Sequence, residues 1–299
     1  MKKQYIYAAV SILIWSTLAA FTKSLLGTIP NFQVLFICSS LAFLFLLAVN
    51  LFTGGLKTLK LLRIKDILKM VGLGFVGIFL YKALYNVGLI GLTSQQACVI
   101  NYLWPIMTVI FSCLILKERV TVMKIVAMVC SFVGIAILTG GIGTSEIGFS
   151  VIFGIVGCFI AAACYGLFSV LNKRENYDLK VSMMIFWLTS ALVSLPLGLV
   201  FETWVPVSGS SWAGLLWLGI LGDGLAYLTW AMALCGLKNT ATVANLAYLT
   251  PFFSVIVSMV FLDEPFDFKA LIALVFIVGG IMTQSITAAI RHKKEENRC

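Results

Sequence analysis

Long apolar runs separated by short polar stretches dominate the pattern of hydrophobic and polar positions along this chain. The runs are continuous rather than alternating, and each is about 20 residues long. A helix of about 20 apolar residues spans the hydrocarbon layer of a bilayer, where an open backbone finds no hydrogen-bond partner. We therefore predict an all-α polytopic membrane protein with ten transmembrane helices. The predicted spans are residues 5–26, 31–52, 68–87, 93–115, 121–140, 147–171, 181–200, 211–236, 240–262 and 268–289.

Composition and charge agree with this prediction and orient the helices. Of the 299 residues 61% are hydrophobic and only 11% are charged, whereas soluble domains carry about 25% charged residues. Of the 21 Lys and Arg residues, all but Lys23, Lys82 and Lys269 fall on one side of the predicted membrane. Because Lys and Arg concentrate in cytoplasmic loops, both termini are predicted to be cytoplasmic. The Lys and Arg residues of these loops account for the net charge of +9. The lipid bilayer is therefore an expected partner, and nucleic acid is not.

The second half of the chain repeats the first in sequence. A shift of 146 residues places residues 245–265 over residues 99–119, so that Tyr102 falls on Tyr248, Pro105 on Pro251 and Glu118 on Glu264. An odd number of helices in each repeat turns the second copy upside down in the membrane. We predict two inverted five-helix repeats, residues 1–146 and 147–290, and a charged cytoplasmic tail, residues 291–299. Inverted repeats of this kind are typical of secondary transporters, with the substrate site where the halves meet.

Short motifs relate both repeats to a known family. Each repeat has a proline followed, after about 12 residues, by an acidic corner before the next helix. This pattern resembles the EamA-like family of the drug/metabolite transporter (DMT) superfamily. The stretches IWST (14–17) and NYLWP (101–105) look like its branch of bacterial aromatic amino acid exporters. The resemblance implies ten helices, a location in the bacterial cytoplasmic (inner) membrane, and export of a small polar metabolite.

Two charged side chains fall inside predicted spans, Lys82 and Asp223, on helices that are repeat mates. A charge at mid-span costs about 2.5–3.5 kcal/mol on insertion scales and is a functional candidate by default. We hypothesise that Lys82 and Asp223 receive the two ends of a zwitterionic amino acid. Three alternatives stay open: a self-neutralising ion pair, a Lys82 that reaches towards the outer interface, and an Asp223 that binds a proton and couples transport to it.

Aromatic and polar residues complete the candidate site. Pro105 and Pro251 each remove a backbone hydrogen bond and are expected to break their helices. The small polar stripe around them (Ser94, Cys98, Thr108 and Ser112, with repeat mates including Ser254 and Ser258) is expected to serve helix packing. The predicted substrate-binding residues are Trp15, Tyr81, Lys82, Tyr85, Asn101, Tyr102, Trp104, Tyr165, Asp223, Tyr227, Trp230 and Tyr248.

Other functional classes fit the sequence less well. The single histidine, His292, lies in the charged tail, and no metalloprotease, nucleophile-elbow or phosphate-loop motif occurs. We therefore predict neither an enzyme nor a cofactor or metal site, and we expect a functional monomer. The favoured function is secondary transport of small polar metabolites, most of all aromatic or neutral amino acids. A channel is one alternative. The other is a proton-coupled transporter of organic cations, such as quaternary amines or drugs, which would use Asp223 and the aromatic rings but not Lys82.

Overall fold

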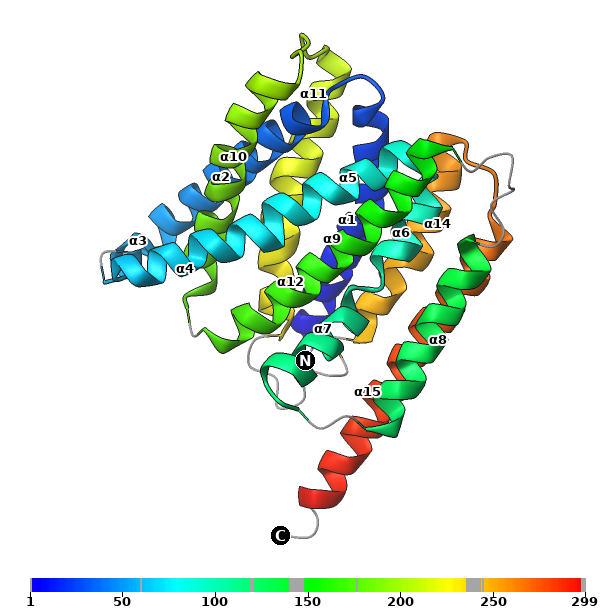
Figure 1. Cartoon of the computed structure of the whole chain (residues 1–299). Helices are drawn as coiled ribbons and strands as arrows, with labels where there is room; N and C mark the ends of the chain where they lie inside the picture. The colour runs from blue at the N-terminus through cyan, green and yellow to red at the C-terminus, as the bar shows by residue number, and fades with distance from the viewer. Residues whose placement is uncertain are drawn as a thin grey trace.

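The computed structural model describes residues 2–59, 61–118, 121–139, 148–175, 177–234, 243 and 245–296, and it is all-helical over them (Figure 1). No β-strand occurs in this part of the chain. In chain order the elements are α1 (Lys2–Leu26), α2 (Asn31–Thr53), α3 (Leu56–Leu59), α4 (Ile64–Gly74), η1 (Phe75–Leu80), α5 (Tyr81–Gly91), α6 (Ser94–Asn101), α7 (Trp104–Ile115), α8 (Val122–Thr139), α9 (Phe149–Arg174), α10 (Leu179–Phe201), α11 (Gly209–Leu216), η2 (Trp217–Leu225), α12 (Ala226–Leu234), η3 (Asn245–Leu249), α14 (Thr250–Leu262) and α15 (Phe268–Glu296).

Seven helical segments of the described chain are long and apolar enough to cross a membrane. They are Lys3–Leu26, Asn31–Thr53, Ile64–Gly91, Ser94–Ile115, Phe149–Arg174, Leu179–Phe201 and Gly209–Trp230. Three further apolar helices are shorter: Val122–Leu138, Leu246–Leu262 and Phe268–Thr283. Each of these segments overlaps one stretch predicted from the sequence. The chain is therefore an all-helical protein suited to cross the membrane several times.

The structure differs from the predicted elements at several places. The stretch 93–115 forms two helices, α6 and α7, rather than one. The stretch 68–87 extends at both ends, to Ile64 and Gly91, and includes the π-helical turns of η1. Helix α15 continues to Glu296, so most of the predicted tail is helical, because Lys, Glu and Arg are good helix formers. The start of the predicted span at residue 240 and the boundary at 146–147 lie outside the described residues.

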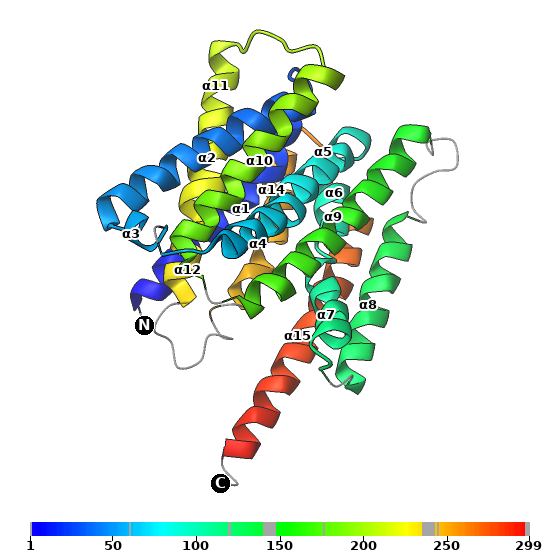
Figure 2. The same ribbon diagram turned by 60° about the vertical axis from the view of Figure 1, so that its left-hand side comes forward.

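Helices from the two halves of the chain pack against each other. Helix α2 lies along α10, and α8 lies along α15 at one side of the molecule (Figures 1 and 2). Helix α9 packs on α5 and α7, and α1 packs on α12 and α14. The long helices α1 and α9 therefore each pack against two helices of the same pair of repeat positions, with one face left exposed.

A carboxylate of the second half caps a helix of the first half. Glu264, between α14 and α15, accepts hydrogen bonds from the backbone N–H groups of Ser94 at 2.7 Å and Gln95 at 3.3 Å, at the start of α6. Lys23 Nζ lies 3.7 Å from the same carboxylate. The Gln95 side chain bonds back to the loop, to Pro265 O at 2.9 Å and Asp267 N at 3.2 Å. A negative charge at a helix N-terminus is favourable because the helix dipole is positive there.

The start of α2 is held in the same way. Glu202, which follows α10, accepts from Phe32 N at 2.9 Å and from Gln33 N at 3.2 Å. The Gln33 side chain donates to Val205 O at 2.7 Å and accepts from Val205 N at 3.0 Å. We call these two arrangements the Glu264 clamp and the Glu202 clamp. Each joins a loop of the second half to a helix start of the first half.

Candidate functional site

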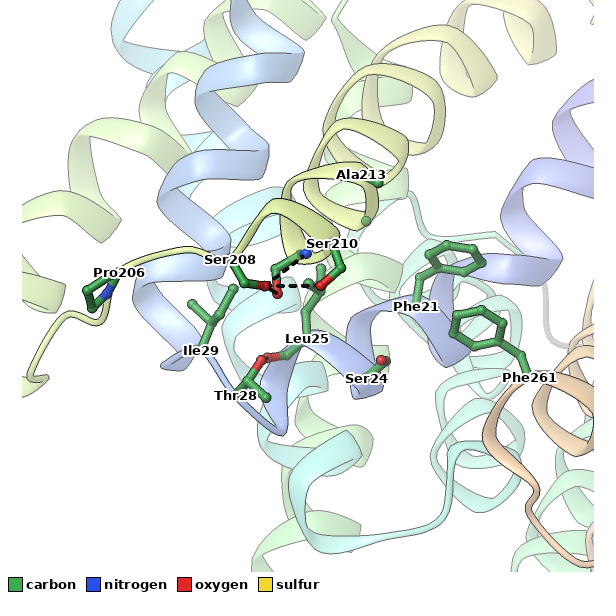
Figure 3. Close-up of a pocket in the computed structure, with 12 residues that line it drawn as sticks. Phe21, Ser24, Leu25, Thr28, Ile29, Pro206, Ser208, Ser210, Ala213 and Phe261 are labelled. Carbon is green, nitrogen blue, oxygen red and sulfur yellow. Dashed lines mark hydrogen bonds between the residues drawn. The ribbon is translucent and has the colours of Figure 1, made fainter.

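A wide groove lies at the end of α1, beside the start of α11 and Phe261 of α14 (Figure 3). Its volume is about 600 Å³. The Ser208 hydroxyl lies within hydrogen-bond distance of the Ser210 and Ser211 hydroxyls, and Thr28 Oγ1 donates to Leu25 O. None of the predicted substrate-binding residues lines this groove, which makes it the weaker candidate.

A smaller cavity lies at the centre of the helix bundle. Its volume is about 140 Å³, and helices of both halves of the chain line it. Seven of the lining side chains are aromatic, and few are polar. The lining residues are Trp15, Leu18, Ala19, Tyr81, Tyr85, Cys98, Asn101, Tyr102, Trp104, Tyr165, Tyr227, Ala247, Thr250 and Ser254. A mostly apolar lining with a few polar groups is typical of small-molecule sites, which usually have volumes of about 300–1,000 Å³, so this cavity is narrower than a typical site.

The structure brings eight of the twelve predicted substrate-binding residues to this cavity. They are Trp15, Tyr81, Tyr85, Asn101, Tyr102, Trp104, Tyr165 and Tyr227. Trp230 does not line the cavity, but its ring centroid lies 5.4 Å from that of Trp15, which does. Tyr248 packs against the buried core cluster around Ile100 and Leu103. Lys82 and Asp223 are not among the lining residues either.

The aromatic side chains of the wall contact one another across helices. The rings of Tyr165 and Tyr81 have centroids 4.9 Å apart, and those of Tyr165 and Trp104 are 5.2 Å apart at a nearly perpendicular angle. On the other side the rings of Trp15 and Tyr227 are 5.3 Å apart. Such offset and edge-on pairs are favourable by about 0.5–1.5 kcal/mol each beyond their burial. The wall is therefore a packed aromatic surface supplied by both halves.

The two predicted breaks, at Pro105 and Pro251, lie beside the cavity. Helix α6 ends at Asn101 and α7 begins at Trp104, so Pro105 occupies the first turn of a new helix, as Pro251 does in α14. Pro251 has no N–H and cannot donate to Ala247 O one turn earlier. The Tyr102 hydroxyl takes this role and donates to Ala247 O at 2.7 Å. Tyr102, at the break between α6 and α7, thus supplies the hydrogen bond that Pro251 cannot donate to Ala247 O.

Lys82 and Asp223 bind each other. Lys82 Nζ lies 2.6 Å from Asp223 Oδ1 and 2.5 Å from Oδ2, and the Asp223 side chain is only 1% exposed. The ammonium also lies 4.9 Å from the centroid of the Trp187 ring, which packs edge-on against Tyr227 of the cavity wall. This is the arrangement that the ion-pair alternative predicts. Binding of a zwitterion by both charges would require the pair to separate.

Widened helical turns position both charges. The π-helical segment η1 ends directly before Tyr81 and Lys82, and η2 contains Asp223. Single π-helical turns inside α-helices occur often at functional sites because they change the direction in which the following side chains point. The sequence gives no simple signal for these turns.

Sequence reasoning assigned Cys98 and Ser254 to helix packing and did not single out Thr250, although all three line the cavity. Thr250 directly precedes Pro251, and Ser254 follows it one turn later. Polar residues spaced by four beside a helix-breaking proline were the available signal. Within the described residues, no group of three or more His, Cys, Asp or Glu side chains is placed to hold a metal ion.

Comparisons with known proteins extend over nearly the whole chain. The chain is 28% identical over 283 residues to the aromatic amino acid exporter YddG of Ancylobacter novellus, covering 93% of this chain and 95% of that protein. It is also 28% identical over 250 residues to an uncharacterized transporter of Archaeoglobus fulgidus, covering 79% and 84% of the two chains. One solved crystal structure, 23% identical, superimposes with a TM-score of 0.69 over 98% of this chain and 99% of that chain, which shows a shared fold.

A sequence model of one family matches two stretches that together make up most of the chain. The family is described as the EamA-like transporter family, and the matched residues are 2–140 and 152–285. The family is one of transporters, and it lies within the DMT superfamily that the sequence motifs indicate. This chain belongs to the EamA-like transporter family.

Proposed function

We propose that this protein exports aromatic or other neutral amino acids by alternating access through the central cavity. The observation that carries the proposal is the aromatic wall of that cavity, built from helices of both halves of the chain. A substrate held between two halves can be released to either side when the halves rock against each other. Flat aromatic side chains of a substrate would stack on the rings of Tyr81, Tyr165 and Trp104.

The proposed architecture is ten transmembrane helices in two inverted repeats. Lys117 and Asp263, which are 146 residues apart, both have positive φ, 54° and 53°, and are the only non-glycine residues in the described chain that do. The packing partners also exchange as an inverted repeat requires: α9 packs on α5 and α7, while its mate α1 packs on α12 and α14. Both observations support equivalent helix corners and equivalent helix contacts in the two halves.

The proposed setting is the bacterial cytoplasmic membrane, with both termini in the cytoplasm. The distribution of Lys and Arg in the loops supports this orientation. A central cavity lined by helices of both halves of one chain supports a functional monomer. Export rather than uptake is supported by the name of the relative from Ancylobacter novellus, an aromatic amino acid exporter.

One feature of the cavity also suits a second class of substrate. Aromatic faces attract any cation, including a quaternary amine that has no N–H group. Proton-coupled transport of organic cations is therefore the second candidate, with Asp223 as the proton-binding group. The closed Lys82–Asp223 pair favours the first candidate, because an Asp223 carboxylate bound to Lys82 is not available to a cation in the cavity.

A ligand panel tests the proposed substrate class. We expect phenylalanine, tyrosine and tryptophan to raise the melting temperature of the purified protein in detergent, because a ligand at 100 times its Kd stabilises the folded state by about 2.7 kcal/mol. Glutamate and lysine serve as controls and should have little effect, since the cavity lining offers no further charged partner. Stabilisation by choline or tetraphenylphosphonium, with none by amino acids, would favour the organic-cation candidate.

A further inference from the structure

Asn101 carries an unused hydrogen-bond acceptor in the central cavity. Its Nδ2 donates to Tyr81 Oη at 3.1 Å, which fixes the amide plane. Its Oδ1 is buried and has no hydrogen-bond partner among the described residues, although Asn101 lines the cavity. The residue as a whole is 9% exposed. Because buried polar groups are nearly always hydrogen-bonded, this oxygen is a position at which a ligand in the cavity can donate a hydrogen bond.

Thr250 supplies a second oxygen of the same kind, from the other half of the chain. The residue is 8% exposed, and its Oγ1 is buried and accepts no hydrogen bond within the described chain. The neighbouring Tyr102 hydroxyl donates its only hydrogen to Ala247 O, so the hydrogen bond between the two hydroxyl groups is donated by Thr250 to Tyr102 Oη. The lone pairs of Thr250 Oγ1 are therefore also available to a ligand in the cavity.

The side chains of Lys82 and Asp223 bind each other and are not free to bind a ligand in the cavity. Both carboxylate oxygens of Asp223 lie within hydrogen-bond distance of Lys82 Nζ, and neither residue lines the cavity. A positively charged ligand group in the cavity would therefore meet neutral oxygens and aromatic faces rather than a free carboxylate. Aromatic faces attract a cation, and the two neutral oxygens accept N–H groups.

These requirements select one type of ligand group. A carboxylate has no hydrogen to donate to Asn101 Oδ1. A quaternary ammonium satisfies the aromatic faces but leaves both oxygens without a donor. A primary ammonium matches all of them, because it carries three N–H groups for the two oxygens and a positive charge for the aromatic faces.

We propose that Asn101 Oδ1 and Thr250 Oγ1 together bind the protonated primary amine of the substrate. This subsite makes the cavity prefer amino acids to quaternary ammonium compounds. The inference rests on the proposed function and deepens it, because it assigns the amine to neutral oxygens rather than to Asp223.

Calorimetric titration of the purified full chain tests the subsite with matched ligands. The ligands are phenylalanine, N,N,N-trimethylphenylalanine, which keeps the charge but has no N–H, and 3-phenylpropionate, which lacks the amine. We expect the wild type to bind phenylalanine about tenfold or more tightly than either analogue, as the loss of hydrogen bonds to a charged donor implies. In Asn101→Leu and in Thr250→Val this preference should fall towards one, while the affinity for the two analogues changes by less than about threefold.

Thr108→Val is the matched control. It removes the same hydroxyl group from α7, where Thr108 Oγ1 donates to Trp104 O at 2.9 Å and the residue does not line the cavity. The control should keep the wild-type preference. If Asn101→Leu does not fold, the nearly isosteric Thr250→Val still gives the decisive comparison.

The possible failures are distinguishable. If the wild type prefers phenylalanine and both variants keep that preference, the subsite is wrong and the proposed function stands. If the wild type binds the trimethylated ligand or choline but no amino acid, the proposed function fails and the subsite fails with it.

Discussion

Replacing Lys82 by Met, or Asp223 by Leu, should destabilise the protein by about 3–5 kcal/mol, whereas replacing both together should restore most of that loss. The two side chains lie 2.5 Å apart at their closest, and Asp223 is almost completely buried. Removing one partner leaves the other charge without compensation in a medium of low dielectric constant. Removing both leaves two apolar side chains of similar length in place of the pair. Thermal denaturation of the single and double variants in one detergent measures the coupling.

An exposed ion pair provides the control for this cycle. Lys69 lies 3.0 Å from Glu175, and the Lys69 side chain is 56% exposed. Lys69→Met should therefore change the stability by no more than about 1 kcal/mol. If the losses of the two single variants at Lys82 and Asp223 simply add in the double variant, the pair is not energetically coupled and the prediction is wrong.

Transport by the same double variant separates the roles left open for the two charges. Normal transport would show that the pair only joins the helices that carry Lys82 and Asp223. Loss of transport by a double variant that is as stable as the wild type would show that the charges act on the substrate or on a coupled proton. We expect normal transport, because the cavity wall contains neither residue.

The second large effect is expected at the Glu264 clamp. Glu264→Ala should lower the stability by about 3 kcal/mol, because hydrogen bonds to a charged group contribute about 1.5–3 kcal/mol each. The substitution leaves the N–H groups of Ser94 and Gln95 without their acceptor and removes the carboxylate beside Lys23. Glu264→Gln keeps one acceptor oxygen and should lie between the wild type and the alanine variant. Denaturation midpoints in detergent give the order.

Its repeat mate Glu118 is the control for this prediction. The Glu118 side chain is 42% exposed, and its carboxylate lies 3.0 Å from Lys124 Nζ on the next helix. Glu118→Ala should cost less than about 1 kcal/mol, as is usual for an exposed pair. Equal losses for Glu264→Ala and Glu118→Ala would contradict the role assigned to the clamp.

Residues whose position depends on helical periodicity could be predicted from the sequence. Tyr81 and Tyr85 are four residues apart on one helix face, and both line the cavity. Trp104 and Asn101 flank a break that Pro105 makes visible in the sequence. In each case a local rule places the side chain, and the repeat register indicates which face turns inward.

Features that depend on contacts between distant segments could not be predicted in the same way. Glu264 and Glu202 each follow a helix and are expected, from sequence, to be loop charges, whereas in the structure they cap helices more than 150 residues earlier. The pairing of Lys82 with Asp223 was one of several alternatives, since the sequence does not show how η1 and η2 turn their helices. Thr250 could not be singled out in an apolar helix, because the unfilled acceptor capacity of its Oγ1 depends on how the cavity folds.

Counterflow in proteoliposomes tests the central claim most directly. Vesicles are loaded with unlabelled phenylalanine, and the entry of a trace of labelled phenylalanine is followed against a matched set loaded with buffer. An alternating-access transporter of amino acids should take up the label transiently above its outside concentration, with saturation as the outside concentration rises, and only in the loaded vesicles. Entry of the label that is equal in both sets and does not saturate, as through a channel, or no entry in either set, would contradict the account.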